Sequence, residues 1–473
     1  MKKRMLVVGG VALALLAVVL VRPGRADPKA DDAAEHAFRD AIGGPPPGWT
    51  GPVFKLSRDY PKQKPAPCST RDCPWLAIDP GFDVSFDTVP SPWERGPAKD
   101  YIAAILDYVR QGQDPNLANA VGFQVNVGGS TRWFHVPWMA YDPAVGRDWV
   151  HGTTNERTAH LGDLLGDGKG FGLHGLSRMR AECESRWAKG FETWSVGVYN
   201  EAGGWSIGQA FPADGRPSIG EWMGAKMPNG LPFPEGTVVV KFLTTNAPPD
   251  CVPYLRGSPE WQIDRHRRNP DTGEYSCERE VQISRLVQVD VAVVDPRSPT
   301  RWVYGTYAYN GHIDADNVWD RLVPVGLQWG SDPWTFPAVP KESSIPARQS
   351  VLNEGLNRDG VYQHFGCNGR LAGPVDNPQS SCVSCHASAF TAPNGAINQM
   401  GVNVPPSFGF DGICRQYSSE NAAYFGSLIS PQKYSAQYAD ALSLDTSLQL
   451  AVAFTQYGYY NTNGRPQPCQ GPN

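Results

Sequence analysis

Between residues 281 and 294 the chain reads VQISRLVQVDVAVV, a stretch rich in β-branched residues in which apolar and polar side chains partly alternate. Two further runs, GTVVVKFLT at residues 236–244 and WVYGTYAY at residues 302–309, have the same β-branched or aromatic character. Runs of this length and composition are typical of β-strands. Their spacing predicts an antiparallel sheet or sandwich with helices attached, which is an α+β fold.

Other patterns predict helices and loops around these strands. After Pro97, apolar residues recur at helical spacing up to Val109, and Gly112 follows the last turn, so we expect a helix there. Residues 446–457 show a second helical pattern. Residues 265–274, RHRRNPDTGE, are charged and polar and predict a loop.

The length of 473 residues predicts more than one domain. Hydrophobic residues make up 41% of the chain, which is enough apolar material to exclude wholesale disorder. We expect a large β-rich domain at residues 27–335, for which we recognise no family, and a linker rich in Pro and Ser at residues 336–350. After residue 351 the β-branched runs vanish, so residues 351–473 form a smaller domain of helices and loops in this interpretation.

Residues 1–26 resemble an export signal. Basic residues at positions 2–4 precede an apolar run at residues 5–21, and small residues stand before Asp27, where cleavage is expected. The alternative is an uncleaved membrane anchor, and the protein would contact a membrane only in that case. Removing the five basic residues of this segment changes the formal charge from -5 to -10. We therefore expect an exported, periplasmic protein without a nucleic-acid partner.

The ten cysteines are consistent with an oxidising compartment. Cys68 and Cys73, in a short polar segment, are the first pair that we expect to form a disulfide bond. We also expect Cys251 to pair with Cys277, and Cys367 with Cys414, although sequence alone cannot establish connectivity. The alternative is that some of these residues are free, buried thiols.

One motif carries chemistry: Cys382-Val-Ser-Cys385-His386 is a C-x-x-C-H sequence. Two thiols three positions apart on one helical turn can add to the two vinyl groups of one porphyrin, and the histidine that follows can bind the iron. A thioredoxin-like site would need a βαβ context, and a zinc site would need a second pair of ligands. Neither is present in the sequence around the motif, so we predict one covalently attached haem c.

On this motif, residues 351–473 resemble a monohaem cytochrome c domain. The match covers about a quarter of the chain, and it consists of the signature, a loop and a C-terminal helix. The resemblance implies that Cys382 and Cys385 carry the two thioether bonds. It also implies that His386 is the proximal ligand of the iron.

The sixth position of the iron is less directly indicated. Small cytochromes c usually take this ligand from a methionine downstream, and Met400 is the only methionine after the motif. The resemblance therefore assigns the role to Met400. His364, upstream of the motif, is the rival ligand, and an open sixth position is a third possibility.

Together these features predict an exported monohaem c-type cytochrome that transfers electrons. Its partner would be a redox protein or a small-molecule reductant or oxidant. Two alternatives remain open at this stage. One is a haem enzyme, peroxidase-like or oxygenase-like, with an open iron site. The other is a haem-bearing binding or sensor protein in which the β-rich domain does the main work.

Overall fold

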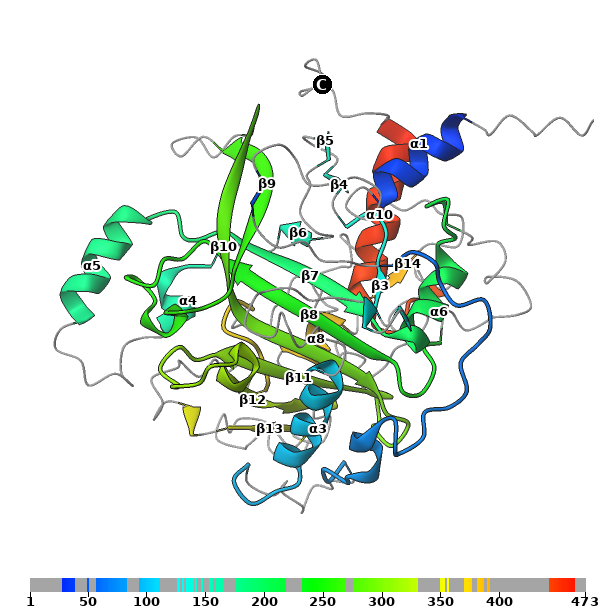
Figure 1. Ribbon diagram of the computed structural model, residues 1–473, viewed down its shortest axis with the longest axis horizontal. Coiled ribbons are helices and arrows are strands. Elements are labelled where there is room, and N and C mark those ends of the chain that lie inside the picture. Colours follow the sequence, from blue (N-terminus) through cyan, green and yellow to red (C-terminus); the bar gives the residue numbers. More distant parts are fainter. Residues whose placement is uncertain are drawn as a thin grey trace, which may run out of the picture.

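An antiparallel sheet of nine strands runs through the described part of the chain (Figure 1). Its main path has the strand order β13-β12-β11-β10-β8-β7-β3, while β6 pairs with β7 and β9 pairs with β10. The strands are β3 (Phe134–His135), β6 (Thr153–Asn155), β7 (Thr193–Tyr199), β8 (Val238–Thr245), β9 (Glu260–Arg268), β10 (Tyr275–Val294), β11 (Trp302–Tyr309), β12 (Leu322–Gln328) and β13 (Ser350–Leu352). The prediction of an α+β fold built on an antiparallel sheet is confirmed.

The computed structural model does not describe every residue. It describes residues 28–38, 49–50, 57–82, 93–110, 126–127, 130–131, 133–139, 141–142, 146–147, 153–155, 159–165, 176–217, 232–268, 275–330, 349–353, 355–356, 370–376, 381–386, 389–391 and 442–463. The predicted export signal and most of the predicted linker lie outside these ranges. So do His364, Met400 and the expected Cys367–Cys414 pair.

The predicted strands are present, and one is longer than expected. β8 and β11 coincide closely with the runs quoted from the sequence, whereas β10 begins at Tyr275 and forms a hairpin with β9. Residues 265–268, which we expected in a loop, therefore belong to β9, and that prediction was wrong. Charged side chains are tolerated there because the hairpin exposes its faces: Val281 and Ile283 are 40% and 44% exposed.

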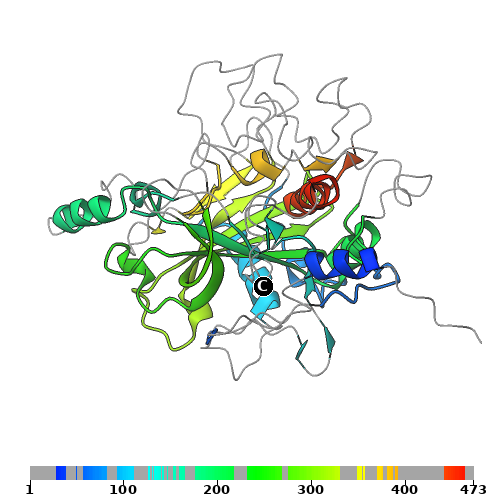
Figure 2. The same ribbon diagram turned by 90° about the horizontal axis from the view of Figure 1, so that it is seen from above.

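Helices cover the two faces of the sheet (Figure 2). On one face α3 (Ala98–Arg110) packs against β12, and a Cβ atom on Gly305 of β11 would lie 2.8 Å from Cδ1 of Ile102. On the other face lie α8 (Cys382–His386) and α10 (Leu448–Asn463). The remaining helices are α1 (Pro28–Ala37), α4 (Leu161–Leu165), α5 (Leu176–Arg186), α6 (Glu201–Ala210) and the short 3₁₀ turns η1 (Pro74–Ala77), η3 (Pro253–Leu255) and η4 (Val318–Arg321).

Both predicted helices form. α3 buries Tyr101, Ile102, Ile105 and Val109, as the helical pattern predicts. α10 begins two residues later than expected and continues to Asn463, because Asp445 and Thr446 form a turn with positive φ angles of 48° and 68°. No helix in the described ranges is long and apolar enough to cross a membrane.

The C-terminal part of the chain packs directly on the sheet of the large part. β13, at residues 350–352, adds a strand to β12, so the sheet extends across the expected domain boundary. Leu450 and Phe454 of α10 share one buried cluster with Trp302 and Tyr304 of β11. The division into two domains at residue 351 stays a prediction.

Three two-stranded ribbons accompany the main sheet in the described part. They are β1 (Asn126–Val127) with β2 (Ser130–Thr131), β4 (Tyr141–Asp142) with β5 (Gly146–Arg147), and β14 (Phe390–Thr391) with β15 (Leu442–Ser443). The third ribbon matters most, because it ties the segment after α8 to the segment before α10.

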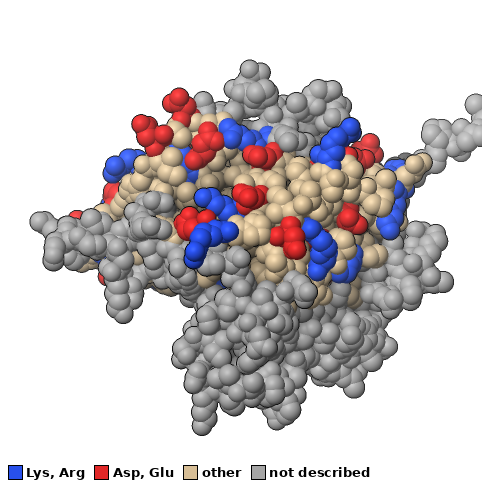
Figure 3. Space-filling model, turned by 90° about the horizontal axis from the view of Figure 1, so that it is seen from below, with Lys and Arg blue, Asp and Glu red and all other residues tan. Residues whose placement is uncertain are grey.

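On the molecular face shown in Figure 3, basic and acidic side chains alternate over the described surface without a large area of one sign.

Two disulfide bonds join described cysteines. Cys68 pairs with Cys73, as predicted. Cys251 pairs with Cys183 of α5 and not with Cys277, so the expected Cys251–Cys277 bond was wrong. The physical reason is tertiary: α5 packs beside the turn that precedes η3, which places the Cα atoms of Cys183 and Cys251 5.7 Å apart.

Candidate functional site around Cys382, Cys385 and His386

The C-x-x-C-H motif forms the single helical turn α8, and Ser381 caps this turn. The Ser384 backbone N–H donates to Ser381 Oγ at 3.3 Å, and the Ser381 backbone N–H donates to Ser384 Oγ at 2.6 Å. This reciprocal pair of hydrogen bonds satisfies donors that the start of a helix leaves open. As a result Cys382 and Cys385 lie on one helical turn, as the motif predicts.

Gln328 of β12 attaches this turn to the sheet. Its Oε1 atom accepts from the Val383 backbone N–H at 3.2 Å, and its Nε2 atom donates to Ser381 Oγ at 3.1 Å. Gln328 is fully buried, so both bonds are shielded from water. The Cys382 N–H also donates to the Leu371 carbonyl at 3.1 Å. The position of the motif is therefore set by Gln328 of the large part together with Leu371.

The imidazole of His386 is oriented by a backbone carbonyl. Its Nδ1 atom lies 2.8 Å from the carbonyl oxygen of Thr446, sixty residues further along the chain. A carbonyl can only accept, so we assign the proton to Nδ1, and the lone pair of the ring is then on Nε2. The Tyr304 ring packs against the imidazole, with ring centroids 4.9 Å apart and planes tilted by 42°. This is the arrangement that a metal-binding histidine requires from its surroundings.

A pair of carboxylates, Asp290 of β10 and Asp376 from the segment before α8, lies close to the Cys382 thiol. Gln288 Nε2 donates to both oxygens of Asp290, at 2.9 and 2.8 Å, and to Asp376 Oδ2 at 3.3 Å. Thr306 Oγ1 donates to Asp290 Oδ1 at 2.8 Å, and the Gly373 N–H donates to Asp376 at 2.8 Å. Two carboxyl groups therefore share one amide donor inside the protein.

The electrostatics follow from this burial. Burial and, to a smaller extent, the neighbouring Asp376 raise the pKa of Asp290 to about 7 against the opposing effect of Lys241. Burial likewise raises the pKa of the Cys382 thiol well above its ordinary value, and both carboxylates add to that effect. Hence this thiol is held in its neutral form.

The structure brings together three of the four site residues expected from the sequence. Cys382 and Cys385 are thiols on the same turn as His386, and Met400 lies outside the described residues. Within the described ranges, no group of three or more His, Cys, Asp or Glu side chains is arranged to hold a metal ion. The contributions of Tyr304, Gln328 and the Thr446 carbonyl were missed. For the buried carboxylate Asp290 the sequence held one signal: an acidic residue stands inside a β-branched run, Val289-Asp290-Val291.

Comparison with known proteins adds no further information about the site. No protein-family model, no curated protein and no solved structure matches this chain.

Proposed function

We propose that this chain is an exported monohaem c-type cytochrome that transfers electrons through a haem bound covalently to Cys382 and Cys385, with His386 as a ligand of the iron. One observation carries the proposal: His386 Nδ1 is bonded to the Thr446 carbonyl at 2.8 Å. This bond places the proton on Nδ1, so the lone pair of the ring is on Nε2, and it fixes the orientation of the ring.

The residues around the motif fit such a group. Cys382 and Cys385 project from one helical turn, the separation at which two thiols can reach one porphyrin. One side of the motif is apolar: Val383, Ala389 and Leu444 are buried in the cluster that also contains Tyr304. This side would suit the hydrophobic face of a porphyrin, whereas Asp290 and Asp376 lie on the side of the Cys382 thiol.

A bound haem would supply a one-electron couple at its iron. The chain's own residues would bind and orient it. Cys382 and Cys385 would hold the porphyrin edge, while His386 would donate its Nε2 lone pair. The Thr446 carbonyl would hold the proton on Nδ1, and the Tyr304 ring would restrict rotation of the imidazole.

The finer features of the proposal concern the sixth ligand, the partner and the location. We assign the sixth position to Met400, with His364 as the rival. The partner is a redox protein or a small reductant or oxidant, and the location is the periplasm. The two disulfide bonds support an oxidising compartment.

The first test is the visible spectrum of protein produced in a host that attaches c-type haem, recorded oxidised and reduced, with a pyridine haemochrome assay. We expect one thioether-bound haem per chain and low-spin iron that is inert to cyanide. The double variant Cys382→Ala/Cys385→Ala should lose the covalent haem. His160→Gln, which changes an exposed histidine outside the motif, serves as the control and should retain it.

Each remaining outcome contradicts part of the proposal. Absence of covalent haem in the wild-type protein would overturn it. High-spin iron that binds cyanide and turns over peroxide would replace electron transfer by the catalytic alternative. Replacement of Met400 by Ala should lower the reduction potential and open the iron, and an unchanged spectrum would remove Met400 from the site.

A further inference from the structure

The carbonyl that orients His386 belongs to a turn of unusual backbone conformation. Asp445 and Thr446 have φ angles of 48° and 68°, in the left-handed region that side-chain-bearing residues rarely adopt. For a β-branched residue such as Thr446 this conformation is costly, by about 1–3 kcal/mol. Such a turn persists only if the surrounding structure holds it, so the contacts of residues 443–447 identify what holds the carbonyl in place.

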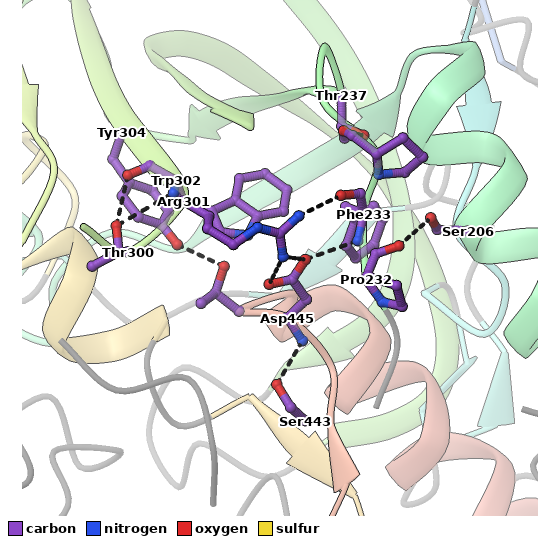
Figure 4. Close-up of polar contacts among 12 residues, drawn as sticks. Ser206, Pro232, Phe233, Thr237, Thr300, Arg301, Trp302, Tyr304, Ser443 and Asp445 are labelled. Atoms are coloured by element: carbon purple, nitrogen blue, oxygen red, sulfur yellow. Dashed lines mark hydrogen bonds and ion pairs between the residues drawn. The ribbon is translucent and has the colours of Figure 1, made fainter. Parts of the chain in front are cut away.

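The first set of contacts is an ion pair between a buried carboxylate and the partly exposed guanidinium of Arg301 (Figure 4). The Asp445 carboxylate, which is almost completely buried, accepts from the Phe233 N–H at 2.8 Å and from Arg301 Nη1 at 3.2 Å. Arg301 Nη2 donates in turn to the Phe233 carbonyl at 2.9 Å. Arg301 itself has a φ angle of 62°. Both partners of Asp445 come from the large β-rich part: Arg301 directly precedes β11, and Phe233 lies in the segment before β8.

The second set of contacts comes from two tyrosines of the sheet. The Tyr304 hydroxyl donates to Thr446 Oγ1 at 2.8 Å, and the Tyr304 ring also packs against His386. The Tyr199 hydroxyl and Ser447 Oγ share a hydrogen bond of 2.6 Å. Consequently, β7 and β11 hold the turn on both sides of the Thr446 carbonyl.

We propose that Arg301, Asp445 and Tyr304 are positioning residues for His386, through which the β-rich sheet sets the reduction potential of the haem. This inference rests on the proposed function, and it assigns a role to the part of the chain for which we recognise no family. The chemistry is a hydrogen-bond effect. The stronger the bond from Nδ1–H to the carbonyl, the more basic the ring and the more it stabilises the oxidised iron.

Loosening the turn should therefore weaken the Nδ1–H bond and raise the reduction potential. A tenfold change in the relative affinity of His386 for the two iron states corresponds to about 59 mV for a one-electron couple. We expect a rise of this order for Asp445→Ala and a smaller rise for Asp445→Asn, which keeps one acceptor oxygen. Tyr304→Phe, which keeps the ring and removes the hydroxyl bond to Thr446, should also raise the potential.

The test uses the haem-loaded full-length chain, with the haemochrome assay first on every variant. The potential is measured by redox titration, and the exchange rate of the His386 Nδ1 proton is measured by NMR. Tyr254→Phe is the matched control: Tyr254 is equally buried and donates to the Leu164 carbonyl at 2.9 Å, away from His386. We expect similar losses of stability for the two tyrosine variants, but a raised potential and faster proton exchange only for Tyr304→Phe.

The possible failures are distinguishable. Absence of covalent haem in the wild-type protein would overturn the proposed function. Intact covalent haem with unchanged potential and proton exchange in both Tyr304→Phe and Asp445→Asn would overturn the positioning role alone. An equal shift in Tyr254→Phe would show a general effect of lost stability and would also overturn it.

Discussion

Asp290 should make the stability of the folded protein depend on pH in the direction opposite to that of an ordinary surface aspartate. Burial raises the pKa of Asp290 to about 7, whereas an aspartate in an unfolded chain has a pKa of about 3.9. Between these values the folded protein binds more protons than the unfolded chain does. The stabilising contribution of the neutral carboxyl is therefore fully present below about pH 4 and is lost as the pH rises through about 7.

The size of the effect follows from the shift in pKa. Three pH units correspond to about 4 kcal/mol at most, because each unit is worth about 1.4 kcal/mol. Gln288 and Thr306 also donate hydrogen bonds that favour the charged form of Asp290, so we expect a loss of about 2–4 kcal/mol between pH 4.5 and pH 8.

Replacement of Asp290 by Asn should remove this dependence. The amide has the shape of the neutral carboxyl, and it keeps an acceptor for the Thr306 hydroxyl. It also directs a donor towards Gln288, at a cost of about 1 kcal/mol. The variant should thus be slightly less stable than the wild type at pH 4.5 and more stable at pH 8.

Urea unfolding followed by the fluorescence of the 15 tryptophans, from pH 4.5 to pH 8, measures this difference. Asp376→Asn removes the neighbouring charge and should move the midpoint to lower pH. Asp250→Asn is the control of opposite sign, because the hydrogen bond from Arg186 lowers the pKa of that exposed carboxyl. If the difference between Asp290→Asn and the wild type does not change with pH, the assignment of a neutral carboxyl at Asp290 is wrong.

Three further predictions concern the thiol, the long disulfide bond and a buried cap. Burial raises the pKa of the Cys382 thiol, so in the folded chain without haem we expect this thiol to react with iodoacetamide at pH 8 at least ~10-fold more slowly than in urea. Peptide mapping would measure the two rates, and equal rates would contradict the prediction. Replacing Cys183 and Cys251 by Ser opens a loop with a sequence separation of 68 and should lower the free energy of unfolding by about 4 kcal/mol, measured by urea unfolding; an unchanged midpoint would argue against the bond. Asn200 caps α6, accepts from the Val238 N–H at 3.0 Å and donates to the Gly236 carbonyl at 2.8 Å. Asn200→Ala should cost about 3 kcal/mol in a thermal or urea melt, and a cost below ~1 kcal/mol would show that these groups find other partners.

Local patterns in the sequence predicted local structure well. β-branched runs became β8, β10 and β11, because side chains of this shape fit a pleated, half-buried surface. The helical spacing after Pro97 produced α3, and a five-residue separation made the Cys68–Cys73 bond predictable. The spacing of the C-x-x-C-H motif likewise determines how its two thiols are arranged, since one helical turn suffices to bring them together.

What lies around that motif was decided by tertiary structure alone. The Thr446 carbonyl reaches His386 across sixty residues, and Gln328 of β12 reaches Val383 across fifty-five. Carbonyl and amide groups occur at every residue, so nothing in composition marks the one that will meet an imidazole. The turn at Asp445 is contacted by Arg301 and Phe233, which are distant from it in the sequence. Thus the residues that we propose to bind a haem were named from a local motif, whereas the groups around them depend on which face of the sheet the C-terminal segment covers.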